Sequence, residues 1–219
     1  MTDIAAEPPV SGTIKAVIFD LGGVILRTVN PEPRQQLAVR LGVSLHDLYH
    51  QIFSSESAHL ATLGKIGTAE HWKQVQFHLN ISNEELTRAI QQFWDGDRLD
   101  FSMVAYLRSL RPRYKTALLS NAWDNLRGLI ENEWKIASAF DEVIISAEVG
   151  LAKPDHRIFQ LALNRLGVDA GEAVFVDDFS ENIDGARWLG LHAVQFSSPD
   201  QTIAELGRYL NQGRKTEDR

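Results

Sequence analysis

The distribution of apolar residues along the chain predicts five buried strands. Short apolar runs rich in β-branched residues lie at 14–19, 116–119, 143–145, 173–176 and 192–196. Runs of this length, bounded by turn residues, are typical of strands buried on both faces. Between the later runs, apolar residues recur at helical spacing, as they do after Pro154 and before Gly190. Alternating strands and helices predict an α/β fold, a doubly wound and mostly parallel sheet with helices on both faces.

The segment between the first two strands follows a different pattern. Residues 30–97 contain no strand pattern, and their apolar positions follow helical spacing at 37–41, 45–53, 69–79 and 84–94. Pro31 and Pro33 precede these helices and Asp95-Gly96-Asp97 ends them, as expected for linkers. We therefore expect a helical cap at 30–97 inserted into a Rossmann-like core of residues 13–29 and 98–210, with flexible tails at 1–12 and 211–219.

Composition narrows the classes of partner. The chain carries 22 Lys+Arg against 29 Asp+Glu, a net charge of −7, with no dense basic run, so nucleic acid is not an expected partner. No apolar stretch is long enough to span a membrane, and the first residues lack the pattern of a secretory leader. The absence of cysteine excludes thiolate chemistry and fits a reducing compartment. We expect a soluble cytoplasmic protein, either a monomer or a homodimer.

Polar residues follow four of the predicted strands. Taken singly, each has an ordinary structural explanation as a turn, a helix cap or a solvated lysine. In a doubly wound sheet, however, the carboxyl ends of the strands meet at one edge, where ligands bind. We therefore expect one site built from these positions: Asp20, Gly22, Gly23, Ser120, Asn121, Lys153, Asp177 and Asp178.

Together these side chains match the needs of phosphoryl transfer. The Asp20 carboxylate can attack phosphorus and form an aspartyl-phosphate. Asp20, Asp177 and Asp178 offer the hard oxygen ligands that Mg²⁺ prefers. Lys153 adds positive charge, and the Ser120 hydroxyl and nearby backbone N–H groups can donate to phosphoryl oxygens. Candidate catalytic residues are Asp20, Ser120 and Lys153; candidate substrate-binding residues are Ser120, Asn121, Lys153, Gly22 and Gly23.

The order and spacing of these motifs, from residue 14 to residue 196, resemble the haloacid dehalogenase superfamily. The resemblance implies that Asp20 is the nucleophile, that Ser120 and Lys153 bind the phosphoryl group, and that a helical cap selects the substrate. It also implies that the backbone carbonyl of Gly22 binds the metal, and that Asp178 contacts it more directly than Asp177. The D-x-G-G-V form is similar to a sub-branch with sugar-1-phosphate phosphatases and the N-terminal domain of soluble epoxide hydrolase.

Gly22 departs from the pattern of most phosphatases of that family. They carry an aspartate at this position, which protonates the leaving group and then activates water. General acid–base catalysis is worth on the order of 10² to 10⁴ in rate, so its loss predicts a slow enzyme, one limited to good leaving groups, or one in which another group substitutes. The cap histidines are the candidate substitutes, although each fits a surface or packing role better: His46, His50, His59, His71 and His78.

Other cap residues have weaker functional interpretations. The spacing of Trp72, Phe77, Phe93 and Trp94 fits helix packing better than a substrate pocket. Lys65, in the loop 63–67, fits a solvated lysine slightly better than a contact to a substrate anion. On the core, Trp123 closely follows Ser120, so we expect it to border the site.

The sequence thus predicts a Mg²⁺-dependent phosphohydrolase acting on a small phosphomonoester, of which a sugar phosphate is one candidate. Two alternatives remain open. A 2-haloacid dehalogenase would use the same aspartate without a metal, but would have no need of the Asp177-Asp178 pair. A non-catalytic binding protein that keeps the fold is allowed by Gly22, although it would have no need of the nucleophile and lysine.

Overall fold

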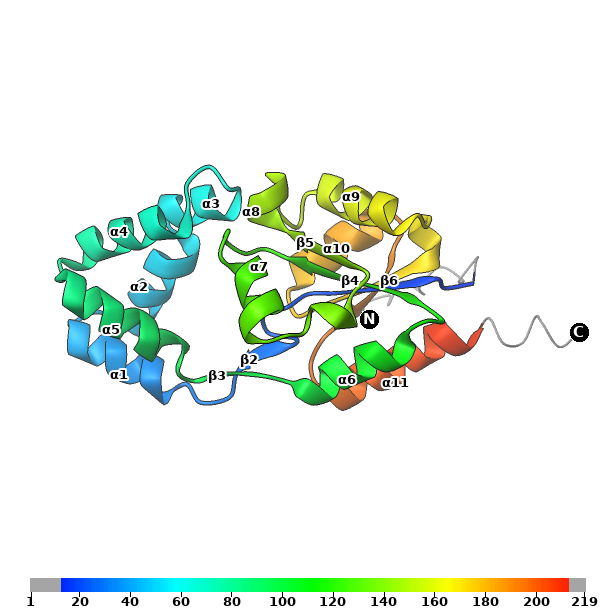
Figure 1. The fold of residues 1–219 in the computed structure, drawn as a ribbon, viewed down its shortest axis with the longest axis horizontal. Helices are drawn as coiled ribbons and strands as arrows, with labels where there is room; N and C mark the ends of the chain where they lie inside the picture. The colour runs from blue at the N-terminus through cyan, green and yellow to red at the C-terminus, as the bar shows by residue number, and fades with distance from the viewer. Residues whose placement is uncertain (1–12, 213–219) are drawn as a thin grey trace, which may run out of the picture.

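The computed structural model describes residues 13–212, which contain a parallel sheet of five strands (Figure 1). These strands are β1 (Ala16–Phe19), β4 (Lys115–Ser120), β5 (Glu142–Ile145), β6 (Ala173–Asp177) and β7 (His192–Gln195). Their order is β5-β4-β1-β6-β7, and every neighbouring pair is parallel. The predicted fold class is confirmed, and β1 is the central strand.

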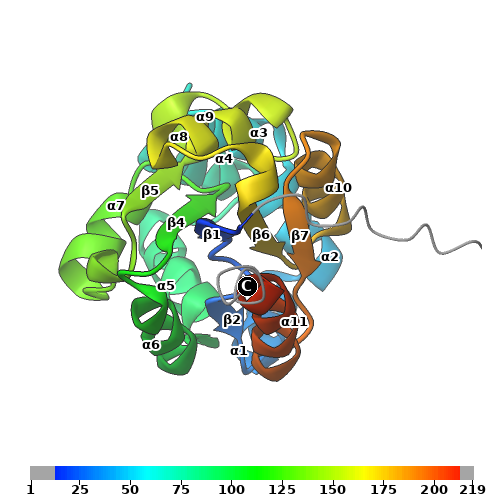
Figure 2. The same ribbon diagram turned by 90° about the vertical axis from the view of Figure 1, so that its right-hand side faces the viewer.

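Helices cover both faces of this sheet (Figure 2). α6 (Phe101–Leu110) and α11 (Pro199–Gln212) pack on one face, and α9 (His156–Leu166) and α10 (Ser180–Trp188) pack on the other. Along β1, Val17 and Phe19 point into the first apolar cluster, whereas Ala16 and Ile18 point into the second. Successive side chains of a strand alternate between faces, so one short apolar run supplies both cores.

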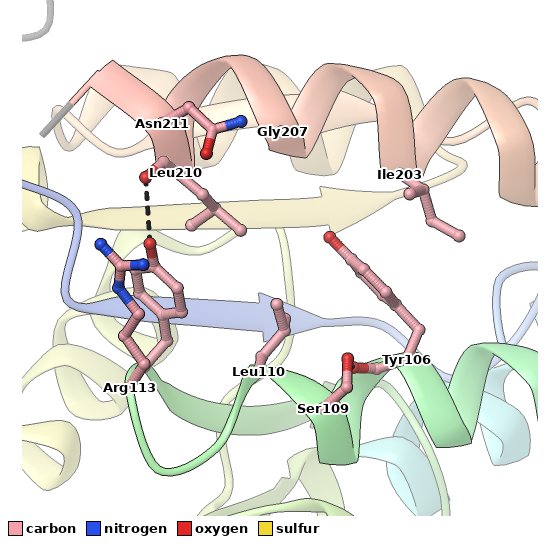
Figure 3. A pocket seen from close by; sticks show the side chains of 9 residues that line it. Tyr106, Ser109, Leu110, Arg113, Ile203, Gly207, Leu210 and Asn211 are labelled. Carbon is pink, nitrogen blue, oxygen red and sulfur yellow. Dashed lines mark hydrogen bonds between the residues drawn. The ribbon is translucent and has the colours of Figure 1, made fainter. Parts of the chain in front are cut away.

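Short helical elements occupy the remaining connections of the core. They are α7 (Leu126–Gly128), η2 (Leu129–Glu133), η3 (Ala137–Ala139), α8 (Ser146–Val149) and η4 (Ala170–Glu172). A shallow hollow of about 320 Å³ lies between α6 and α11 (Figure 3). Beside it, the Tyr114 hydroxyl donates to the Leu210 carbonyl at 3.0 Å and ties the loop after α6 to α11.

The predicted cap, residues 30–97, is helical from Glu32 to Trp94 apart from short connections, but its last residue, Asp97, begins a strand (Figure 1). Its elements are α1 (Glu32–Leu41), α2 (Leu45–Tyr49), the π-helical turn η1 (His50–Ser54), α3 (Glu56–Thr62), α4 (Thr68–Leu79) and α5 (Asn83–Trp94). Ser44, Ser55 and Ser82 cap α2, α3 and α5 by accepting backbone N–H groups. Leu37 and Phe93 lie in an apolar cluster separate from the two clusters of the sheet. The cap therefore has a core of its own.

A two-stranded antiparallel ribbon joins the cap to the sheet, and the sequence did not predict it. It pairs β2 (Leu26–Thr28) with β3 (Asp97–Leu99). Next to it, the buried Arg34 of α1 donates from Nη2 to both Asp97 carboxylate oxygens, at 2.8 and 2.7 Å, and from Nε to the Phe93 carbonyl at 2.9 Å. One guanidinium thus ties α1, α5 and β3 together.

The predicted chain ends are only partly covered by the structure. α11 continues to Gln212, so the first two residues of the predicted tail 211–219 are helical. The rest of that tail, and the predicted tail 1–12, lie outside the described residues. Within residues 13–212, no helix combines the length and apolarity needed to cross a bilayer.

Candidate active site

The predicted site residues on the first, second and fourth predicted strands meet at the carboxyl edge of the sheet. Phe19, the last residue of β1, is in register with Leu118 of β4 and Val176 of β6. The backbone N–H of Asp20 continues this pairing and donates to the Val176 carbonyl at 2.8 Å. Asp20 is 6 % exposed, and Ser120 is also buried. The central strand β1 therefore places the candidate nucleophile, Asp20, between the ends of β4 and β6.

Lys153 connects two of the acids. Its Nζ lies 2.8 Å from Asp20 Oδ1 and 2.6 Å from Asp177 Oδ2, and its side chain is almost fully buried. The Asn121 amide fixes the lysine backbone, since Nδ2 donates to the Lys153 carbonyl at 2.9 Å and Oδ1 accepts the Lys153 N–H at 2.8 Å. Asn121 is therefore a positioning residue for Lys153. A contact between Asn121 and substrate stays a prediction.

Protein donors already engage the Asp177 carboxylate. Besides Lys153, the Asn182 Nδ2 donates to both oxygens at 3.0 Å, and the Phe179 N–H donates to Oδ1 at 2.8 Å. Asn182 is buried in the first turn of α10, five residues after Asp177. Sequence reasoning missed it because a lone asparagine in a helix has no distinctive signal.

Asp178 is in the opposite situation. Its Oδ1 is buried and has no hydrogen-bond partner within residues 13–212. Its carboxylate lies directly against Gly23, where any Cβ would overlap Asp178 Oδ2 and Cγ. Gly23 also has a φ of +74°, a conformation that favours glycine. The second glycine of the loop thus leaves room for an acid whose buried oxygen lacks a protein partner.

Burial and mutual repulsion perturb the ionisation of this cluster. Burial, partly offset by Lys153 and reinforced by Asp177, raises the pKa of the Asp20 carboxyl to about 6. Burial and the nearby charge of Asp177 also raise the pKa of Asp178. Burial alone would lower the pKa of the Lys153 ammonium, but the carboxylates of Asp20 and Asp177 outweigh it and raise that pKa. Lys153 therefore remains charged, but its single positive charge does not balance the negative charges of the three carboxylates.

The cluster fits a hard divalent cation. Oxygens of Asp20, Asp177 and Asp178 all lie within 4.8 Å of one another. Three carboxylates and one ammonium leave a formal charge of −2 in a buried site, which is costly unless a cation compensates it. Mg²⁺ prefers oxygen ligands such as carboxylates. Among the oxygens of this cluster, the buried Asp178 Oδ1 has no hydrogen-bond partner within residues 13–212 that a bound cation would have to displace. The donor set thus suits magnesium, and the expectation that Asp178 binds it more directly than Asp177 stays a prediction.

The two glycines after Leu21 differ in their surroundings. A Cβ at Gly22 would meet no atom within 4 Å, so space is open beside it. The Gly23 N–H donates to the Leu26 carbonyl at 2.9 Å within the loop. Substrate contacts by these glycines, and the proposed metal contact of Gly22, stay predictions, and any contact by Gly23 has to use an atom other than its N–H.

Among the cap histidines, His71 is a poor candidate for an acid or a base. His71 is fully buried; its Nδ1 lies 2.9 Å from Ser57 Oγ and its Nε2 lies 3.1 Å from the Ile52 carbonyl. Burial lowers its pKa, which favours the neutral ring. The other four candidates, His46, His50, His59 and His78, are exposed. His71 is therefore best explained as a packing residue.

The loop after β4 connects the site to the cap. The Trp123 ring lies 4.6 Å from the His71 ring and 5.8 Å from the Trp72 ring. Asp124 Oδ1 accepts the Thr68 N–H at 3.0 Å and is also bonded to the Thr68 hydroxyl. Trp123 therefore packs against the cap, and a border on the active site stays a prediction.

The cap loop 63–67 also contacts the core. A Cβ at Gly64 would overlap the Ala147 carbonyl, so this loop lies directly on α8. Lys65 is exposed, as expected for a solvated lysine. On the core side, the buried Ser146, which sequence reasoning also missed, accepts the Ala122 N–H at 2.9 Å and donates to the Ala122 carbonyl at 3.0 Å. It fixes the segment between Ser120 and Trp123.

Comparison with known families identifies the family of this chain. The model of the haloacid dehalogenase-like hydrolases matches residues 14–190, a span that contains all eight predicted site positions. The chain belongs to this family. For this haloacid dehalogenase-like hydrolase, the assignment of Asp20 to the family's nucleophile position and of Lys153 to its lysine position stays a prediction.

Individual relatives are similar over nearly their full length. The sesquiterpene phosphatase astK of Aspergillus oryzae is 30% identical over 199 residues, covering 89% of this chain and 95% of that protein. The D-ribitol-5-phosphate phosphatase of Bacteroides thetaiotaomicron is 29% identical over 213 residues, covering 90% and 99%. A family enzyme from the same bacterium, crystallised with magnesium and inorganic phosphate, has a similar fold with a TM-score of 0.69, 23% identity and coverage of 85% and 96%.

Proposed function

We propose that this hydrolase cleaves a small phosphomonoester in a Mg²⁺-dependent reaction through an aspartyl-phosphate on Asp20. The observation that carries the proposal is the cluster of three carboxylates, two of them buried and paired with Lys153 and the third, Asp178, with a buried oxygen that has no partner within residues 13–212. A dianionic phosphate enters such a site only when a cation offsets the acids. Two full-length relatives named as phosphatases support the same reaction class.

The chain's own residues have separable roles in this reaction. Lys153 binds Asp20 Oδ1, which leaves the other oxygen to attack phosphorus. The bond from this oxygen to phosphorus forms as the bond to the ester oxygen breaks, and the alcohol leaves with a proton taken from solvent. Water then attacks the aspartyl-phosphate, releases inorganic phosphate and restores the carboxylate. Lys153 and the Ser120 hydroxyl stabilise charge on the phosphoryl oxygens, and bound magnesium would neutralise part of that charge.

The dehalogenase alternative fits the cluster less well. A 2-haloacid is itself a carboxylate, and metal-free displacement of halide would place it beside a site of formal charge −2. Nothing in that reaction uses the unpartnered oxygen of Asp178. The phosphate reaction uses both features, since its metal neutralises the acids and the substrate together.

Hydrolysis of p-nitrophenyl phosphate and a panel of sugar and polyol phosphates tests the proposal. We expect activity that requires magnesium, is lost in Asp20→Asn, and is retained in Asp184→Asn, a control at an exposed aspartate of α10. Absence of phosphatase activity above the Asp20→Asn background, together with halide release from 2-haloacids, would establish the dehalogenase instead. Absence of both activities would favour the non-catalytic alternative.

A further inference from the structure

A cluster of aromatic rings lies where the cap meets the loop that leaves the active site. Phe53 of η1 is at its centre, with ring centroids 5.9 Å from Tyr49, 5.6 Å from Phe93, 5.9 Å from Trp94 and 6.3 Å from Trp123. The first four residues belong to the cap, and Trp123 belongs to the core. Phe53 nevertheless remains 44% exposed. Its ring therefore packs on one side and is open to solvent on the other.

The position of Trp123 ties this cluster to the site. Trp123 follows Ser120, the predicted phosphoryl-binding residue at the end of β4, by three positions. The intervening residues are fixed, because the Asn121 amide bonds the backbone of Lys153 and Ser146 bonds both backbone groups of Ala122. Trp123 thus follows a segment that begins at Ser120 and is held by these hydrogen bonds, and the Phe53 ring is stacked on Trp123 at a centroid distance of 6.3 Å.

The Tyr49 hydroxyl of this aromatic cluster, and the Arg34 guanidinium packed against it, already bond to protein partners. The Tyr49 hydroxyl accepts from Arg34 Nη1 at 2.8 Å, and Arg34 Nη2 pairs with Asp97. The guanidinium also lies over the Phe93 ring, 4.3 Å from its centroid. A polyol loses water on binding and needs hydrogen-bonding groups in exchange, whereas a hydrocarbon gains by covering exposed aromatic surface.

The core adds apolar surface close to the acidic cluster. Phe179 directly follows Asp178 and is 63% exposed, and its backbone N–H is bonded to Asp177. Exposed phenylalanines thus occur on the cap at Phe53 and on the core next to the predicted metal ligand. A site for a sugar phosphate would be expected to carry polar side chains at such positions.

We infer that the ester group of the substrate is an extended hydrocarbon rather than a polyol, and that it lies against Phe53 and Trp123. This inference rests on the proposed phosphatase function and specifies its substrate class. The relatives do not decide the matter, since one is named for a sesquiterpene substrate and the other for a polyol phosphate. The exposed aromatic surface of this chain favours the hydrocarbon.

A homologous series of n-alkyl phosphates, from ethyl to decyl, tests the inference against ribitol 5-phosphate. We expect kcat/KM to rise with chain length by up to about fourfold per methylene group, the limit for full burial. Phe53→Ala should flatten this rise, so that its loss of kcat/KM relative to wild type grows from ethyl to decyl phosphate. Phe77→Ala is the matched control, because Phe77 is also an exposed phenylalanine of the cap, on α4, and is not among the rings around Phe53. It should keep the wild-type dependence on chain length.

The outcomes separate this inference from the proposed function. Hydrolysis of ribitol 5-phosphate with a flat alkyl series would overturn the hydrocarbon preference and leave the phosphatase intact. If no phosphomonoester is hydrolysed, calorimetric binding of the same series to the magnesium-loaded Asp20→Asn protein decides. Affinity that increases with chain length and decreases in Asp20→Asn combined with Phe53→Ala supports the hydrocarbon site, and affinity independent of chain length refutes it.

Discussion

At the scale of single residues, the adjacent acids Asp177 and Asp178 have different surroundings. Asp177 accepts hydrogen bonds from Lys153, Asn182 and the Phe179 backbone, whereas a buried oxygen of Asp178 has no partner within the described residues. The two aspartates, although adjacent in sequence, therefore differ in their hydrogen bonding. We expect Asp177 to orient the lysine and Asp178 to bind a cation.

This difference predicts different effects of substitution on metal binding. Magnesium should raise the melting temperature of the wild-type protein, because a ligand at a hundredfold excess over its Kd contributes about 2.7 kcal/mol. Asp178→Asn should abolish this rise and lower kcat by more than the roughly 10- to 100-fold typical of changes around a metal site. Thermal melts with and without magnesium, together with kcat, check the prediction.

The control for that experiment is Asp184→Asn, which should behave as wild type in both measurements. Asp177→Asn should lower activity while keeping part of the magnesium-dependent rise. Equal losses of the rise in Asp177→Asn and Asp178→Asn would contradict the division of roles between the two acids.

Gly22 offers a second test at this scale. A Cβ at this position meets no atom within 4 Å, so substitution does not create a clash at the β-carbon. Gly22→Asp should supply the missing general acid and raise the rate on poor leaving groups, such as alkyl phosphates, by on the order of 10². The gain should be smaller on p-nitrophenyl phosphate, whose leaving group needs no protonation.

Gly22→Asn distinguishes proton transfer from steric effects, because the asparagine side chain is nearly the same size as that of aspartate and has no acidic proton. It should give no gain on alkyl phosphates. If the two variants have equal rates, proton transfer at position 22 does not limit the reaction, and solvent or another group already supplies the proton.

At the scale of secondary-structure elements, the cap loop 63–67 and the core helix α8 meet without room for a side chain. Gly64 has a φ of +66°, and a Cβ there would overlap the Ala147 carbonyl. Gly42 at the end of α1 has a nearly identical φ of +67°, but a Cβ there would meet nothing within 4 Å. Substitution of either glycine therefore strains a left-handed backbone to a similar degree. Only substitution of Gly64 also creates an overlap with the Ala147 carbonyl.

This pair allows the contact to be tested alone. Gly42→Ala and Gly64→Ala should each lose about 1–2 kcal/mol of unfolding free energy from the left-handed conformation. Only Gly64→Ala should also displace the cap from α8 and raise KM severalfold. Urea unfolding and steady-state kinetics measure the two effects, and an unchanged KM in Gly64→Ala would mean that the contact does not influence substrate binding.

At the scale of the whole molecule, the sequence predicted features that depend on strand pattern. The five apolar runs predicted the sheet, and the parallel order predicted that Asp20, Asp177 and Lys153 would meet. The ribbon of β2 and β3 was missed because each strand has three residues and no apolar run. Asn182 and Arg34 were missed because a polar residue in a helix resembles a surface residue until its distant partners are known.

The central position of β1 has a consequence for how the molecule opens in solution. β1 is paired on both sides, and the Asp20 amide is bonded to β6, whereas the cap has a separate apolar core. Amide hydrogens at 17–20 should therefore exchange with solvent deuterium only through global unfolding, and those of the cap helices through smaller and more frequent openings. Mass-spectrometric exchange that is equally slow in both would indicate one cooperative unit. If the cap amides exchange faster, Asp20, the proposed nucleophile, stays in place while the cap transiently unfolds and refolds.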